Sequence, residues 1–170
     1  MEKSLDRLSA EVTAVEKHCA NDALAFYEPP AEYKAFFLDL CRLYLDAADW
    51  DRQSIRTLVA DKRGIQNHLV SQAYHCAEQL QKSRDADWLQ LGLAATVLAE
   101  TQTDYRDMLL VRAELYVIAE EAGLDPAPAL SSIAGLDGFG SYAVVLSRRS
   151  GSYRVIPPEK KKRMIMDKRK

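Results

Sequence analysis

The sequence predicts an all-α protein made of stacked antiparallel helix pairs. Apolar residues recur at helical steps of three and four over most of residues 4–136, and proline, glycine or aspartate stands at the ends of several of these segments. The 170 residues are 48% hydrophobic and 28% charged, a composition that excludes collagen-like and wholly disordered chains. We expect residues 1–147 to form a single helical domain with its own core.

The first helix is predicted from one apolar stripe. Leu5, Leu8, Val12, Val15 and Cys19 follow alternating steps of three and four, which places them on one side of a helix of about five turns. The stripe is short for a coiled coil, so we expect this helix to pack on its own domain. Proline follows the helix at residues 29 and 30 and marks the joint to the next segment.

Three helix pairs are expected after this joint, near residues 31–62, 65–100 and 104–136. In the first pair, Asp49 or Asp51 is expected to cap the second helix, which would stop near Gly64. In the second pair, the partner helix begins at Asp85 or Asp87.

The third pair has its own boundary residues. Asp104 is the expected cap of its first helix, which stops at Gly123, and Asp125-Pro126 begins one more short helix.

A weak internal repeat links the pairs. Ala48-Asp49-Trp50 and Ala86-Asp87-Trp88 stand 38 residues apart at the hinges of two pairs, and Asp125-Pro126 stands at the third hinge 38 residues after Asp87. With this spacing the chain resembles a short HEAT/armadillo-like helical repeat protein. The resemblance implies a HEAT-like α-solenoid, and an irregular helical bundle remains the alternative. It implies no particular functional residue.

The C-terminal part departs from the helical pattern. Residues 141–156 fit either a short β-hairpin around a glycine-containing turn or a terminal helix. Residues 148–170 contain ten basic and two acidic residues, a net charge of +8, whereas residues 1–147 carry −10. We expect this basic segment to be flexible.

The sequence also predicts the compartment. The first residues have no signal-peptide core, and no apolar run approaches the roughly 20 residues of a membrane span. Three cysteines without a CxxC pair favour reduced thiols. We therefore expect a cytoplasmic protein without a membrane span, or a nuclear one in a eukaryotic host.

No motif predicts catalysis, a cofactor or a metal. The sequence has no GxSxG, HExxH or phosphate-binding loop. His18-Cys19 and His75-Cys76 are adjacent residues, which point about 100° apart on a helix and cannot grip one ion together. We expect His68 and His75 to be surface or partly packed residues, and the cysteines to be core thiols.

One helix surface is a candidate partner-binding face. Away from the most apolar stripe of the helix expected at 104–123, tyrosine and arginine are residue types enriched where protein partners anchor. The candidate residues are Tyr105, Arg106, Arg112, Tyr116 and Glu120. The alternative is that the tyrosines fill grooves between helices.

These observations favour a non-catalytic protein-interaction module, such as an adaptor, a regulatory subunit or an immunity protein, that binds another protein through an acidic helical surface. The first alternative is a nucleic-acid-associated protein that binds phosphates or another polyanion through its basic tail. The candidate polyanion-binding residues are Lys160, Lys161, Lys162, Arg163, Lys168, Arg169 and Lys170. A small enzyme is the third alternative.

Overall fold

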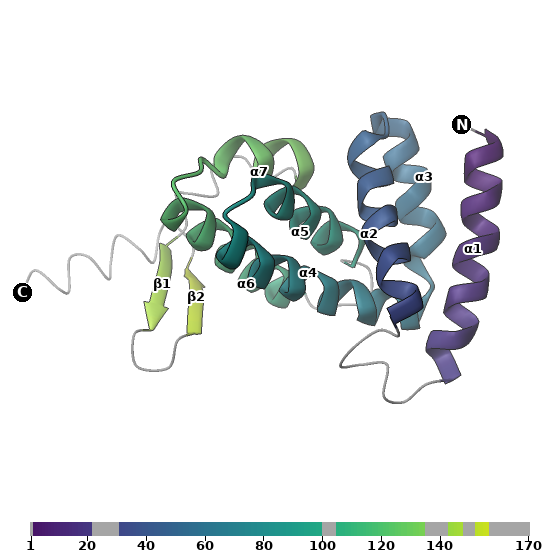
Figure 1. Ribbon diagram of the computed structural model, residues 1–170, viewed down its shortest axis with the longest axis horizontal. Helices are drawn as coiled ribbons and strands as arrows, with labels where there is room; N and C mark the ends of the chain where they lie inside the picture. The colour runs from purple at the N-terminus through teal and green to yellow at the C-terminus, as the bar shows by residue number, and fades with distance from the viewer. Residues whose placement is uncertain (1, 22–30, 100–104, 135–142, 148–151, 157–170) are drawn as a thin grey trace, which may run out of the picture.

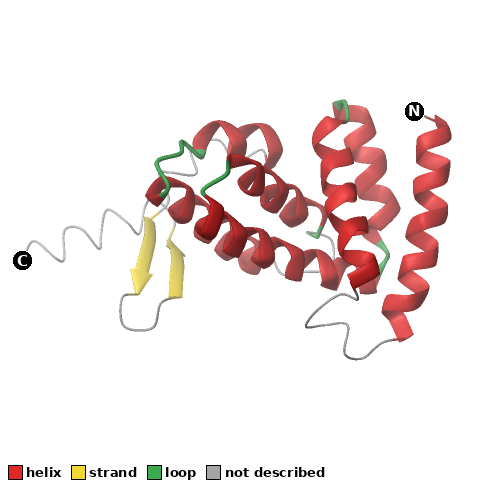
Figure 2. Ribbon diagram, viewed as in Figure 1, coloured by secondary structure: helices red, strands yellow, loops and turns green. Residues whose placement is uncertain are grey.

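The computed structural model describes residues 2–21, 31–99, 105–134, 143–147 and 152–156. Within these ranges the chain forms seven helices and one antiparallel pair of strands (Figure 1, Figure 2). The helices are α1 (Glu2–Asn21), α2 (Ala31–Asp46), α3 (Asp49–Ala60), α4 (Arg63–Ser83), α5 (Ala86–Leu98), α6 (Tyr105–Glu121) and α7 (Ala127–Ala134). The prediction of a helical body is confirmed.

The centre of this body is α5. From Leu89 to Ala99 every residue except Gln90 is buried. A helix that is apolar on every side has to be covered on every side. The covering elements are α2, α3, α4, α6 and α7, all of which contact α5.

The turn between α4 and α5 brings these two helices side by side. Arg84 adopts a left-handed conformation with φ of 57°, and its N–H donates to the Leu80 carbonyl at 2.8 Å, which ends α4. The Asp85 carboxylate accepts a hydrogen bond from the Asp87 N–H at 3.0 Å. The expected cap at Asp85 is therefore confirmed.

Close approach of α4, α5 and α6 depends on Gly92. A Cβ at this position would lie 3.0 Å from Leu115 Cδ2 and 3.1 Å from Cys76 Cβ. Nearby, Gln66 of α4 donates from Nε2 to the carbonyls of Val59 at 2.9 Å and Leu98 at 2.7 Å. Gln66 thus ties the C-terminal ends of α3 and α5 to α4.

The three expected helix pairs are not arranged in the same way. The second pair (α4 and α5) packs on the third pair (α6 and α7), with α4 against α6 and α5 against α7. The first pair departs from this pattern, because α2 packs chiefly against α5. Figure 1 shows α1, α2 and α3 running upright while α4, α5 and α6 run across them.

Two expected boundaries of the first pair are wrong. The N-cap of α3 is Ala48, without a side-chain cap, because the helix starts early enough for the Arg52 N–H to reach the Ala48 carbonyl at 2.9 Å. Asp51 is instead buried. Gly64, expected as a stop, lies in the first turn of α4, where a Cβ would come within 2.6 Å of Cys19 Cβ.

Arg52 joins the first pair to the third. Its guanidinium donates to the carbonyls of Tyr44 at 3.0 Å and Leu45 at 2.9 Å, both in the last turn of α2. It also donates to the Ser132 carbonyl of α7 at 3.2 Å. One side chain therefore satisfies two helix ends.

The end of α6 follows the sequence prediction. Gly123 has a φ of 82°, a left-handed conformation that glycine adopts without strain. The Asp125 carboxylate then accepts from the Ala127 N–H at 3.2 Å at the start of α7. Both expected boundary residues, Gly123 and Asp125, are confirmed.

The first helix contacts the body through its apolar stripe and bonds to α4 through one carboxylate. Leu8, Val12, Val15 and Cys19 are buried, so the predicted stripe is confirmed. Glu16 accepts hydrogen bonds from the N–H groups of Gly64 at 3.0 Å and Ile65 at 2.9 Å. A side chain of α1 thereby caps the N-terminus of a helix 48 residues further along the chain.

The strands β1 (Ala143–Ser147) and β2 (Ser152–Ile156) pair antiparallel, with Val145 opposite Arg154. They lie on both sides of the expected domain boundary at residue 147. β2 packs against α6. In Figure 1 the hairpin and α1 lie at opposite ends of the molecule.

Among the helices of the described ranges, none has the length and apolarity that crossing a membrane requires.

We predict that Glu16→Ala lowers the free energy of unfolding by about 1–2 kcal/mol, because two amides at the start of α4 lose their acceptor. Urea denaturation followed by circular dichroism measures this loss. Glu11→Ala on the same helix is the matched control, since Glu11 makes only an exposed ion pair with Arg7 at 3.5 Å. Equal effects of the two substitutions would contradict the capping role of Glu16.

Candidate interaction surfaces

The expected partner-binding residues of α6 do not form one surface. The side chains of Tyr105 and Arg106 lie outside the described residues. Tyr116 is half-buried and Glu120 is exposed. Arg112 is fully buried, so its expected position on a binding face is wrong.

Arg112 is part of a polar connection inside the core. Its Nε donates to Thr96 Oγ1 at 2.9 Å, and the Thr96 hydroxyl donates to the Leu93 carbonyl at 2.6 Å. Arg112 is buried because α6 is covered on a wide arc by α4, α5 and β2. Val111 and Ala113, the chain neighbours of Arg112, are also buried. The buried surface of α6 is therefore wider than the apolar stripe in its sequence indicates.

Tyr116 lies among carboxylates at the C-terminal end of α6. Burial raises the pKa of its hydroxyl, and the charges of Glu120 and Asp125 raise it further. Burial also raises the pKa of Glu114. The described residues 113–134 include four acidic residues and no lysine, arginine or histidine. This end of α6 is therefore anionic.

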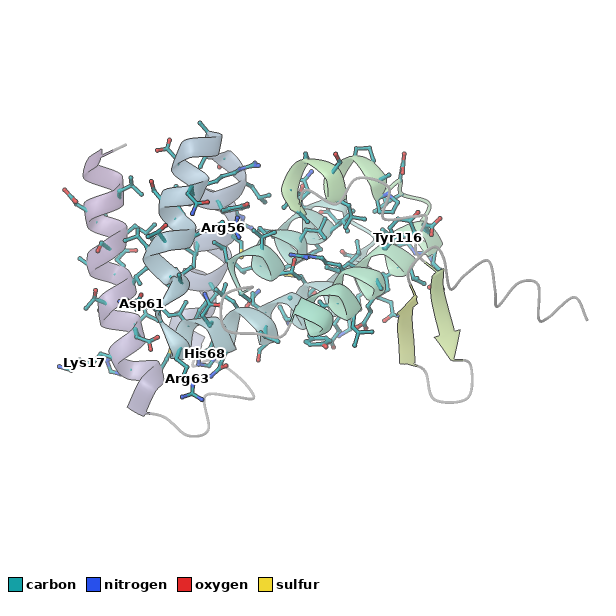
Figure 3. The ribbon with its side chains drawn as sticks, turned by 180° about the vertical axis from the view of Figure 1, so that it is seen from behind. Lys17, Arg56, Asp61, Arg63, His68 and Tyr116 are labelled. Atoms are coloured by element: carbon teal, nitrogen blue, oxygen red, sulfur yellow. The ribbon has the colours of Figure 1, made fainter. Side chains whose placement is uncertain are left out.

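Several cations lie at the opposite end of the helical body. Figure 3 shows Lys17, Asp61 and Arg63 at the α1 end of the body, well away from Tyr116, with Lys17 pointing outward from α1. Lys62 Nζ lies 3.3 Å from Asp61 Oδ1. The amides at this end of α4 are already bonded to Glu16, so the α4 N-terminus does not offer them to an external anion.

A groove of about 350 Å³ lies between α1 and α3. Its lining residues are Leu5, Asp6, Ser9, Gln53, Ser54, Thr57 and Leu58. The two leucines are partly buried, whereas Asp6 and Thr57 are exposed. The groove therefore combines an apolar base with a polar rim, and among the described side chains that line it Asp6 alone is acidic or basic.

The sequence alone does not predict this groove. Leu5 and Leu58 each continue an ordinary helical stripe, and nothing in either segment shows that the two stripes will meet. The signal would have been the serine and threonine residues beside each leucine, which leave a helix face less filled than aliphatic residues do. Only the position of α1 on α3 turns these two faces into a groove.

The cysteines are core residues, as expected. Cys19, Cys41 and Cys76 are free and buried. Burial raises the pKa of Cys76 to about 12, and burial together with the nearby Cys76 strongly raises the pKa of Cys41. Thiols with such high pKa values are neutral at physiological pH and are poor nucleophiles.

Of the two histidines expected at or near the surface, His75 lies there and His68 does not. His18 and His75 are exposed, and the His75 ring meets Trp88 edge-on at 6.0 Å. His68 is fully buried, with its ring 5.4 Å from Phe37, so its expected surface or partly packed position is wrong. Its face of α4 is covered by α2, which the pattern of α4 alone does not reveal. The described residues contain no group of three histidine, cysteine or acidic side chains that could hold a metal.

The seven expected polyanion-binding residues, Lys160, Lys161, Lys162, Arg163, Lys168, Arg169 and Lys170, lie outside the described residues.

Comparison of the chain with protein families, with curated proteins and with solved structures gives no match.

We predict that Thr96→Val lowers the free energy of unfolding by about 1–3 kcal/mol. The substitution keeps the volume of Thr96 but removes the oxygen that accepts from buried Arg112 Nε. Thr13→Val is the control, because Thr13 is an exposed threonine bonded to the Ser9 carbonyl of its own helix. Chemical denaturation of both variants measures the difference, and a Thr96 variant as stable as the Thr13 variant would contradict the proposed connection.

A second prediction concerns the thiols. In the folded protein Cys41 and Cys76 should resist a disulfide reagent at pH 8 and react promptly once urea unfolds the chain. Below about pH 9, ionisation of the Cys76 thiol should not change the free energy of unfolding. This free energy should fall as the pH rises from about 9 towards about 12, because the thiol of the unfolded chain ionises first. Rapid labelling of the native protein would contradict the assignment of both residues to the core.

Proposed function

We propose that this protein is a non-catalytic protein-interaction module whose binding surface includes the groove between α1 and α3. The groove is the observation that carries the proposal. Its volume of about 350 Å³ lies in the range of ligand-binding clefts. Two partly buried leucines can accept an apolar anchor. The Thr57 hydroxyl donates to the Gln53 carbonyl at 2.9 Å, and its oxygen can still accept a hydrogen bond from a partner.

The partner is expected to be cationic near its anchor. Asp6 lies in the groove, and residues 1–147 carry a net charge of −10. Opposite charges accelerate encounter and select the partner more than they add affinity. An adaptor, a regulatory subunit and an immunity protein in the cytoplasm all fit this chemistry. Tyr116 and Glu120 form a second anionic face that a larger partner can contact.

We also propose that the second and third helix pairs form a HEAT-like stack. The support is the packing of α4 on α6 and of α5 on α7, which is the neighbour-on-neighbour contact expected of repeats. The first pair and α1 are then an irregular end of the stack. These helices cross α4 and α5 instead of stacking on them as a further repeat. The α1–α3 groove therefore lies in the irregular part of the fold.

Binding of a nucleic acid or another polyanion through residues 160–170 is the second candidate function. Seven cations stand in these eleven residues, and such a density binds phosphates through release of counterions. The segment has no aromatic residue to stack on bases. Binding would therefore be independent of base sequence and would weaken steeply with salt.

We predict that a groove variant carrying Asp6→Lys and Thr57→Arg loses binding to its partner by at least about tenfold, because a bulky side chain and two new positive charges enter the groove. Partners are captured from the source cells with the tagged protein, identified by mass spectrometry and purified. Titration calorimetry with the purified partner then measures the affinity of each variant.

Thr13→Arg is the matched control, since Thr13 is exposed on α1 and is not part of the groove. We expect this variant to bind as the unsubstituted protein does. A partner whose affinity is unchanged by the groove substitutions but abolished by removal of residues 159–170 would contradict the proposed site. Such a result would favour the basic tail instead.

A further inference from the structure

We propose that the α1–α3 groove of one copy binds residues 159–170 of a second copy, which makes this chain a partner of itself. This inference rests on the proposed function and identifies the occupant of the same site. Side chains from the apolar trio Met164, Ile165 and Met166 would enter the groove, and the lysines and arginines on both sides of the trio would lie near Asp6.

The groove offers an apolar base and an unpaired anion. Leu5 and Leu58 pack on the edge of the core and are only partly covered. Asp6 is exposed and makes no ion pair with a described residue. A segment that binds here therefore needs an aliphatic anchor with a positive charge beside it.

Residues 159–170 have this composition. Lys160-Lys161-Lys162-Arg163 precedes Met164-Ile165-Met166, and Lys168-Arg169-Lys170 follows shortly after. Methionine side chains are flexible and polarisable, so they adapt to irregular apolar surfaces. The segment thus carries an aliphatic trio between two blocks of cations.

The apolar trio favours the groove over the acidic end of α6 as the binding site. The carboxylates near Tyr116 could attract the lysines, but a contact made by charges alone would leave Met164, Ile165 and Met166 in water. Leu5 and Leu58 can cover part of this apolar surface, and removing apolar surface from water favours binding.

The fold favours binding between two copies over binding within one. The segment follows β2, which packs on α6 at the hairpin end of the molecule. The groove lies on α1 and α3 at the other end (Figure 1). A contact between the tail of one copy and the groove of the next is heterologous, and unless it closes into a ring it produces open chains of molecules.

The test measures binding of a fluorescent peptide of residues 159–170 by anisotropy. The receptor is the full chain with Met164→Ser, Ile165→Ser and Met166→Ser, so that its own segment does not compete. We expect a peptide carrying the same three serine substitutions to bind at least tenfold more weakly. Asp6→Lys or Thr57→Arg in the receptor should weaken binding of the natural peptide at least fivefold.

Glu121→Lys is the control for the acidic end of α6. Glu121 is exposed, as Asp6 is, but lies on α6, and we expect this substitution to change the affinity less than twofold. Light scattering on the unsubstituted chain should show a mean mass that rises with concentration. The chain with the three serine substitutions should remain monomeric under the same conditions.

Three results would overturn the proposal: equal affinity of the natural and serine-substituted peptides, a larger effect of Glu121→Lys than of Asp6→Lys, or a monomeric mass for the unsubstituted chain at all concentrations. If self-binding fails while a cellular partner still requires Asp6 and Thr57, the groove remains an interaction site with a different occupant. If both fail, the proposed function fails with it.

Discussion

The fold depends on the burial of α5 on every side. Because this helix has no broad polar face, it is stable in water only when other helices surround it. α2, α3, α4, α6 and α7 meet that requirement together, and their positions follow from it. The same requirement brings polar side chains into the interior. Arg112 reaches Thr96 of α5, and Gln66 reaches the carbonyl of Leu98, because polar groups buried around such a helix need partners inside the protein.

The N-terminal helix is attached in a different way. Its apolar stripe packs on the body, while Glu16 bonds to the amides of Gly64 and Ile65 at the start of α4. The absence of a side chain at Gly64 lets the backbone of α1 come close to α4 at this end. Further towards its N-terminus, α1 and α3 leave the groove that contains Leu5 and Leu58. α1 therefore packs tightly on the body at one end and forms one wall of an open groove towards the other.

Thiols and carboxylates occupy different parts of the described protein. The thiols of Cys41 and Cys76 lie in the core with raised pKa values. The carboxylates near Tyr116 and the carboxylate of Asp6 are instead available at the surface. An acidic body joined to a basic segment can bind cationic partners at one place and polyanions at another. In the proposed self-association, the groove and residues 159–170 are the two halves of one contact.

The sequence by itself determined the features that depend on near neighbours. Helical periodicity, the Asp85 cap and the stop at Gly123 each arise from residues within one or two turns, so local patterns predict them. Tertiary structure decided the rest, because the deciding partner lies far away in the chain. Arg112 and His68 are buried by helices that their own segments do not reveal. The Glu16 carboxylate caps a helix 48 residues away, and the groove exists only where faces of α1 and α3, unremarkable separately, are brought together by packing.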